Sequence, residues 1–206
     1  MLTEDNILDW NKYLEFGGGE FIIFYLFDPC FDNRHATILK NIATAKGATF
    51  REYCAVHLLT LQDPNLLPQL SVNSDMEARI SSLNESHVSL VNKTWKFGGD
   101  EKAFQIIKHL ISHFPTCCIT DEEDRPVSWV LLYDYCAMGP LYTAPEYRGR
   151  GYAKILISTM ATRLHTQGYP VYCLVEEDNH LSYKLFKKLG LTEDPSYRSA
   201  WYEFNY

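Results

Sequence analysis

The stretch GPLYTAPEYRGRGYAKILISTMATRLHT, residues 139–166, decides the fold. Its first six residues are typical of a β-strand, and Pro145 ends that strand. Gly149 and Gly151 then form a turn, and the apolar residues that follow at helical spacing predict a helix from Gly151 to about Thr166. A strand that feeds a helix through a short glycine turn is typical of α/β proteins.

This turn has the chemistry of an anion cradle. Its glycines let the backbone approach a ligand, and the amide N–H groups at the helix start add the positive end of the helix dipole. Arg148 and Arg150 add positive charge. The turn lacks the G-x-x-x-x-G-K-[ST] pattern of a Walker A loop, and Lys154 replaces the third glycine of a dinucleotide fingerprint. A tight turn with exposed arginines is the alternative interpretation.

The surrounding sequence predicts helices and strands in an alternating order. Ser86 and Asp100 are suitable N-caps for two helices, the second of which ends at Pro115. The further expected elements are strands at 116–120, 127–133, 139–144, 171–175 and 201–204, and helices at 151–166 and 181–189. Strands 116–120 and 127–133 form a hairpin, in which Asp121–Asp124 is a solvated turn. This order predicts an α/β fold with a mixed sheet.

The first third of the chain gives weaker indications. Residues 7–14 are weakly helical, and the apolar run 21–27 is either a buried strand or a buried helical turn. Asp32 and Asn33 could cap a helix that continues through Lys46.

The composition excludes several classes of protein. With 206 residues, 46% apolar and 22% charged, the chain is expected to form one globular domain or slightly more. The net charge of −7 disfavours a nucleic-acid partner. No apolar run approaches the ~20 residues of a membrane span, and the first ten residues lack the features of a signal or transit peptide. The six cysteines are expected to be reduced thiols, and no metal site is predicted.

The segment PEYRGRGYAKILIS, residues 145–158, resembles the acyl-CoA-binding motif of the GNAT acyltransferase superfamily. More narrowly, the chain resembles the glycine N-acyltransferase family. The segments that carry this resemblance are LVNKTWKFGGDE (90–101), FPTCC (114–118), RPVSW (125–129), YTAPEYR (142–148) and GYPVY (168–172). The resemblance covers the chain from about Leu83 to its C-terminus, whereas 7–14 and 32–46 match loosely and 17–31 have no counterpart.

The resemblance implies a GNAT-like α/β fold. Its mixed sheet would be flanked by helices and splayed open between the strands at 139–144 and 171–175. Residues 84–206 would form the acyltransferase domain, and residues 1–83 a partly helical N-terminal extension. Family members carry further residues ahead of Met1, so the resemblance also implies a truncated or alternatively started chain. Known relatives act in mitochondria, which is therefore the expected location, with the cytoplasm as the alternative.

The same resemblance implies that acyl-CoA is a co-substrate and that no cofactor is bound permanently. The pantetheine arm would pair with the splayed strand, and the pyrophosphate would meet the glycine turn. The residues expected to contact acyl-CoA are Tyr142, Thr143, Ala144, Arg148, Gly149, Arg150, Gly151, Tyr152, Ala153 and Asn179.

The implied reaction is direct attack of the amino group of glycine, or of another small amino acid, on the thioester. A backbone N–H of the strand at 139–144 would stabilise the oxyanion. The family's proposed glutamate base on that strand corresponds to Ala137, and the tyrosine acid of many GNAT enzymes corresponds to Phe186. The substitute base is then Glu176, with Glu177 and Glu146 as further possibilities.

Three alternatives stay open. A GNAT enzyme that acetylates a protein amine would share the cradle, and so would a non-catalytic CoA-binding relative, which the changes at Ala137 and Phe186 favour. Cys136 or Cys173 could carry the acyl group, but small buried apolar residues are the favoured interpretation of both.

Overall fold

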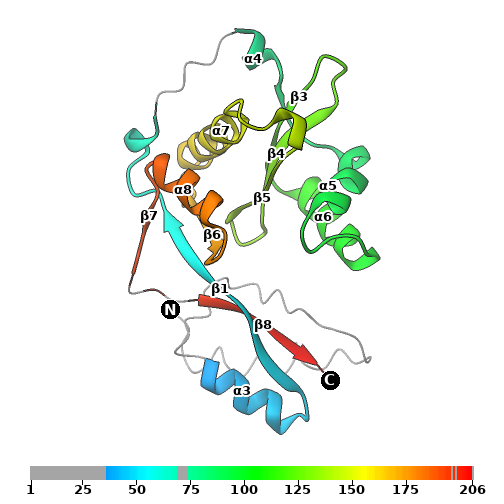
Figure 1. Cartoon of the computed structure of the whole chain (residues 1–206), viewed down its shortest axis with the longest axis vertical. Helices are drawn as coiled ribbons and strands as arrows, with labels where there is room; N and C mark the ends of the chain where they lie inside the picture. Colours follow the sequence, from blue (N-terminus) through cyan, green and yellow to red (C-terminus); the bar gives the residue numbers. More distant parts are fainter. Residues whose placement is uncertain (1–35, 69–73, 196, 198, 206) are drawn as a thin grey trace.

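The computed structural model describes residues 36–68, 74–195, 197 and 199–205 (Figure 1). The predictions for residues 7–14, 21–27 and the caps Asp32 and Asn33 lie outside these ranges. Helix α3 (Ala36–Ala45) confirms the described part of the helix that was predicted to continue through Lys46. Gly47, with φ +74°, ends it in a left-handed conformation that glycine adopts readily.

The longest strand, β1 (Thr49–Thr60), is one that the sequence did not predict. Its first part pairs with β8 (Ser199–Asn205), and its second part pairs with β6 (Tyr172–Glu176) and with β7 (Thr192–Glu193). A register shift between Glu52 and Cys54 disturbs the alternation along β1, so the strand shows no clean local pattern. β1 belongs to the predicted N-terminal extension (residues 1–83), yet it pairs with strands of the predicted acyltransferase domain (residues 84–206). The boundary between these two domains stays a prediction.

A second sheet contains β2 (Ile80–Ser81), β3 (Thr116–Thr120), β4 (Pro126–Leu132) and β5 (Met138–Thr143), in that order. Every ladder of the described residues is antiparallel, including the predicted β3–β4 hairpin, so the parallel pairing expected of a mixed sheet does not occur among them. Strands β5 and β6 lie side by side, yet they belong to different sheets and share no ladder. We call this boundary between β5 and β6 the sheet break. It confirms the predicted splay.

The helices agree with the predicted order, with one correction to a cap. The remaining elements are α4 (Ser74–Ala78), α5 (Val88–Thr94), α6 (Glu101–His113), α7 (Tyr152–Thr166), α8 (His180–Lys188) and the 3-10 turns η2 (Pro64–Leu66), η3 (Glu85–His87) and η4 (Pro145–Tyr147). Asp100 caps α6 as predicted, since its Oδ1 accepts from the Ala103 N–H at 2.7 Å. The predicted Ser86 cap is wrong, because α5 begins after His87 without a side-chain cap. The cap lies one 3-10 turn earlier, where Asn84 accepts from the Ser86 N–H and forms a capping box with His87 at the start of η3.

The β2–β5 sheet is covered by helices on both faces, as Figure 1 shows. Alternate side chains of β4 point to opposite sides: Val130 packs in the core that includes α7, whereas Trp129 and Leu131 pack with α5 and α6. The α7 core continues across the sheet break to β1 and β6, through Leu59 and Cys173 among others. A small third cluster joins α3 to β8. The two sheets are therefore held together by shared helix packing rather than by a ladder.

This packing predicts that Trp129→Ala destabilises the protein strongly. The Trp129 side chain is 1% exposed and its ring stacks on that of Tyr142 at 4.8 Å, so truncation leaves a large cavity. A loss of about 3–5 kcal/mol in the free energy of unfolding is expected in urea titrations. Leu90→Ala, at a position that is 38% exposed, serves as the control and should cost less than about 1 kcal/mol. Equal losses in the two variants would contradict the described core.

Candidate functional site

A hydrogen bond joins the two sides of the sheet break at the end where β5 and β6 begin. The Tyr172 hydroxyl, at the start of β6, donates to the Tyr135 carbonyl, which lies just before β5. From there β5 leads into the glycine turn and α7, while β6 leads to Asn179 and α8. The structure therefore places the two groups of predicted acyl-CoA contacts at the ends of the two strands that border the break.

A bulge interrupts β5 beside the break. Val130 pairs with Leu141 whereas Leu132 pairs with Met138, so β5 contains one more residue than the facing part of β4. Gly139 has φ +152°, a conformation that favours glycine, and a Cβ atom at this position would lie 3.1 Å from Cε2 of Tyr133, which is closer than ordinary van der Waals contact. The Tyr133 ring is therefore packed directly on β5 at the bulge.

The bulge also changes the interpretation of Ala137. The resemblance assigned this residue to the strand, but it lies in the turn before β5, and its carbonyl accepts from the Tyr133 N–H at 3.0 Å. Ala137 is 1% exposed. A buried methyl group therefore stands where the resemblance puts the family's proposed base. Phe186, at the second position where the family pattern changes, is buried in the core with α7.

The glycine turn presents unpaired backbone donors. Gly149 and Gly151 have φ of +78° and +81°, and a Cβ atom at either position would meet nothing within 4 Å. Among the described residues, the N–H groups of residues 149–153 donate to no protein acceptor. They lie at the start of α7, a helix of 15 residues, where the dipole adds positive potential. This is the arrangement that the cradle hypothesis requires.

The arginines of the turn are held by neighbouring carbonyl groups. Arg148 Nε donates to the Thr143 carbonyl at 3.0 Å, which ties the turn to the last residue of β5. Arg150 donates to the Glu146 carbonyl at 3.3 Å, and its guanidinium lies 5.0 Å from the centroid of the Tyr147 ring. Both arginines stay exposed, so their charge remains available to a ligand at the turn.

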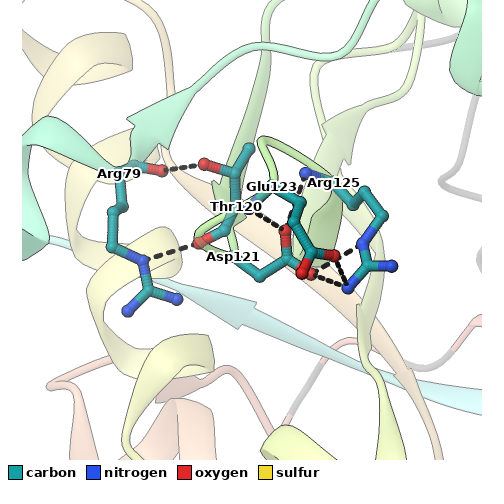
Figure 2. Close-up of polar contacts among 5 residues, drawn as sticks. All are labelled: Arg79, Thr120, Asp121, Glu123 and Arg125. Atoms are coloured by element: carbon teal, nitrogen blue, oxygen red, sulfur yellow. Dashed lines mark hydrogen bonds and ion pairs between the residues drawn. The ribbon is translucent and has the colours of Figure 1, made fainter.

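A third arginine reaches the start of α7 from before β2. Arg79 Nε donates to the Thr120 carbonyl at 2.7 Å, and Thr120 donates back to the Arg79 carbonyl (Figure 2). The Arg79 guanidinium carbon lies 5.6 Å from the centroid of the Tyr152 ring. Arg79 is not among the site residues predicted from the sequence. An isolated arginine between weak elements gives no local signal of this position.

The acidic turn after β3 is a structural feature with one buried carboxylate. Asp121 accepts from the Glu123 and Arg125 N–H groups at 3.0 Å and from Arg125 Nε at 2.8 Å (Figure 2). The hydrogen bond from Arg125 lowers the pKa of Asp121 to about 2. The solvated turn is confirmed for residues 122–124, whereas Asp121 points inward and holds the turn together. No cluster of three or more potential metal ligands occurs among the described residues.

Glu176 lies on the side of the break that faces α5 and α6. Cys173 and Val175 of β6 point into the α7 core, so Glu176, which alternates with them, points to the other face. Its carboxylate forms an ion pair with Lys96, which lies between α5 and α6. The Glu176 side chain is 18% exposed and that of Lys96 is 58% exposed. The predicted substitute base is therefore half-buried and paired with a cation.

Tyr133 connects this carboxylate with the β5 bulge. Burial raises the pKa of the Tyr133 hydroxyl far above its usual range, a hydrogen bond with the Trp95 side chain opposes the rise, and the nearby Glu176 adds to it. The Tyr133 ring also contacts Gly139 across the bulge. Glu176, Tyr133 and β5 thus belong to one neighbourhood. No local sequence pattern points to Tyr133 or Lys96, because both act through contacts with distant segments.

Cys173 is buried and fits the packing interpretation, whereas Cys136 is only partly buried. All five described cysteines are free. Burial raises the pKa of the Cys173 thiol well above its usual range, which opposes the role of an acyl carrier. Cys136 lies in the turn before β5 with φ +67°. None of the described helices combines the length and apolar character that a membrane span requires.

Comparisons with known proteins agree with this geometry. The family model for aralkyl acyl-CoA:amino acid N-acyltransferase matches residues 25–115, and that for FR47-like protein matches residues 119–201. Human glycine N-acyltransferase is 35% identical over 138 residues, which are 67% of this chain and 46% of the human protein. The chain belongs to the glycine N-acyltransferase family.

Two further similarities cover more of the chain. The mouse glycine N-acyltransferase-like protein is 24% identical over 98% of this chain and 69% of its own length. A GNAT-family protein from Novosphingobium aromaticivorans, described as a putative acetyltransferase, has a TM-score of 0.58, with 15% identity and coverage of 77% of this chain and 66% of that chain. The latter confirms the GNAT fold. The chain spans about half the length of the glycine N-acyltransferases it matches.

The buried thiols predict slow alkylation of the native protein. Burial raises the pKa of Cys54 and Cys117 to about 11 and that of Cys118 to about 12. A thiol with a pKa of 11 is roughly one part in a thousand ionised at pH 8. Iodoacetamide at pH 8, followed by peptide mass spectrometry, should label these three cysteines and Cys173 at least ten times more slowly than in urea. If Cys173 in the native protein is labelled as fast as in urea, its thiol is accessible and reactive, and the hypothesis that it carries the acyl group would stand again.

Proposed function

We propose that this protein is an acyl-CoA-dependent N-acyltransferase that transfers an acyl group to the amino group of glycine or another small amino acid. The observation that carries the proposal is the run of unpaired amides at residues 149–153, beside a strand that borders the sheet break. Membership in the glycine N-acyltransferase family supports acyl-CoA and a small amino acid as the two substrates.

In the proposed complex, the pyrophosphate of acyl-CoA accepts from the amides of residues 149–153. The pantetheine arm pairs with the backbone of β5 at the sheet break, where no strand of the other sheet uses those groups. Asn179 Oδ1 is engaged in capping α8, since it accepts from the Ser182 N–H at 3.2 Å. The side-chain NH₂ of Asn179 is not used by this cap and can donate to a pantetheine carbonyl.

The proposed reaction is a single displacement at the thioester carbonyl. The amino acid arrives as an ammonium, and Glu176 accepts one of its protons. The amine nitrogen then forms the C–N bond, the C–S bond breaks, and the CoA thiolate takes a second proton. The backbone N–H groups of β5 are the candidates for stabilising the oxyanion. Glu176 is preferred to Glu177, which is exposed and follows the strand.

We predict that Gly151→Asp weakens CoA binding by well over tenfold in isothermal titration calorimetry. The added carboxylate would face the phosphate site, and an aspartate at φ +81° is also strained. Gly151→Asn carries the same backbone strain without the charge, so it should bind more tightly than Gly151→Asp.

Gly168→Asp is a matched control for this experiment. Gly168 has φ +78°, an open Cβ position and a place beyond the opposite end of α7. It should keep the parent affinity within about twofold. If a folded Gly151→Asp protein binds CoA with the parent affinity, the glycine turn is not the pyrophosphate site.

We predict that Glu176→Gln lowers turnover with glycine at pH 7 by about 10²–10⁴-fold, the usual contribution of a general base. The loss should shrink toward pH 9, where more of the glycine is already free amine. Thiol release at saturating acyl-CoA measures both values. Glu177→Gln is the control and should keep parent turnover. Unchanged turnover in Glu176→Gln would remove this residue from the mechanism.

One specific observation favours a second candidate function. The buried methyl of Ala137 and the buried ring of Phe186 leave both customary side-chain positions without an acid or base, as expected for a non-catalytic CoA-binding relative. Tight CoA binding without thiol release, with any amine, would support that candidate. The mitochondrial location implied by the resemblance stays a prediction.

A further inference from the structure

The ion pair between Lys96 and Glu176 spans the sheet break. Glu176 ends β6, which belongs to the β1 sheet, whereas Lys96 follows α5, which packs on the other sheet. The two residues are 80 positions apart in the chain. The pair is therefore a contact between the two walls of the break, close to Tyr133 and the β5 bulge.

The surroundings of this pair are rich in carboxylates. Burial and the nearby Glu176 raise the pKa of the Cys54 thiol, and Asp178 and Glu52 contribute in the same direction. Lys96 is the cation that opposes them. A ligand with a positive group is therefore attracted here, and a ligand with a negative group depends on Lys96.

We propose that Lys96 binds the carboxylate of the acceptor amino acid and thereby selects amino acids over amines that lack a carboxylate. This inference rests on the proposed acyl transfer. The incoming zwitterion exchanges partners with the pair: its ammonium replaces Lys96 at Glu176, and its carboxylate takes the released lysine. Both protein charges stay compensated through the exchange, which matters for Glu176 because its side chain is 18% exposed.

The exchange requires one mobile and one fixed partner. Lys96 is 58% exposed and has a flexible four-carbon stem, so it can move by the width of a small molecule. Water can solvate the exposed lysine ammonium as the pair opens, whereas the carboxylate of Glu176 needs the incoming ammonium as its new partner. Glu176 is held on the ladder with β1, opposite Val56. An amine that lacks a carboxylate can replace Lys96 at Glu176, but it offers the displaced lysine no carboxylate with which to form a new ion pair.

The experiment compares glycine with glycinamide, which keeps the amine but lacks the carboxylate. Thiol release at saturating acyl-CoA gives kcat/KM for each acceptor in the parent and in Lys96→Met. We expect the preference for glycine over glycinamide to fall at least tenfold in Lys96→Met, mainly through the KM for glycine. The Kd for CoA should stay at the parent value.

Two control variants sharpen this test. Lys93→Met removes an exposed lysine from α5 and should keep the parent preference. Lys96→Arg keeps the charge and should retain most of the preference. An unchanged preference in a Lys96→Met protein that still turns over would overturn the inference and leave the proposed function standing.

Two other outcomes also count against it. Equal losses with glycine and glycinamide would mean that Lys96 acts through Glu176 alone, which contradicts carboxylate binding. No thiol release by the parent with either acceptor would overturn the proposed function, and the inference with it.

Discussion

Strands β5 and β6 lie next to each other and share no ladder, and the candidate site depends on this arrangement. A strand edge carries backbone donors and acceptors that normally attract another strand. Here β5 is paired with β4 on its other side, and β6 is paired with β1. Helix packing holds the two sheets in place, and the Tyr172–Tyr135 hydrogen bond fastens the end where both strands begin. The unpaired edges are thus kept apart and available to a ligand.

The break also organises the chemistry around it. On the side of α7 it places the free amides of residues 149–153 at the end of β5. On the side of α5 and α6 it places Glu176, Lys96 and Tyr133. A thioester held along β5 would lie between these two groups. An acyl-CoA and an amine could therefore approach from opposite sides of the sheets, which separates the two substrates before they react.

Much of the fold could be predicted because its signals are local. The strand, glycine turn and helix of residues 139–166 follow from apolar spacing, Pro145 and two glycines, and the β3–β4 hairpin follows from its polar turn. Of the two predicted caps, Asp100 was correct and Ser86 was not. A 3-10 turn capped by Asn84 comes before α5, and α5 itself begins without a side-chain cap.

The remaining features depend on contacts between distant segments. β1 has no clean alternation because its two halves pack in different clusters and pair with strands near the other end of the chain. The position of Ala137 depends on a bulge, which adds one residue and ends simple counting along the strand. Lys96 lies in a segment that resembles the family, yet its partner Glu176 cannot be read from that segment.

A backbone amide NMR titration with CoA shows directly whether the sheet break and the glycine turn form the acyl-CoA site. We expect the amides of residues 149–153 and of β5 to show the largest shift changes and to gain protection from hydrogen exchange, while those of β8 stay unchanged. Saturable binding that leaves residues 149–153 unaffected, or changes centred on β8, would contradict it.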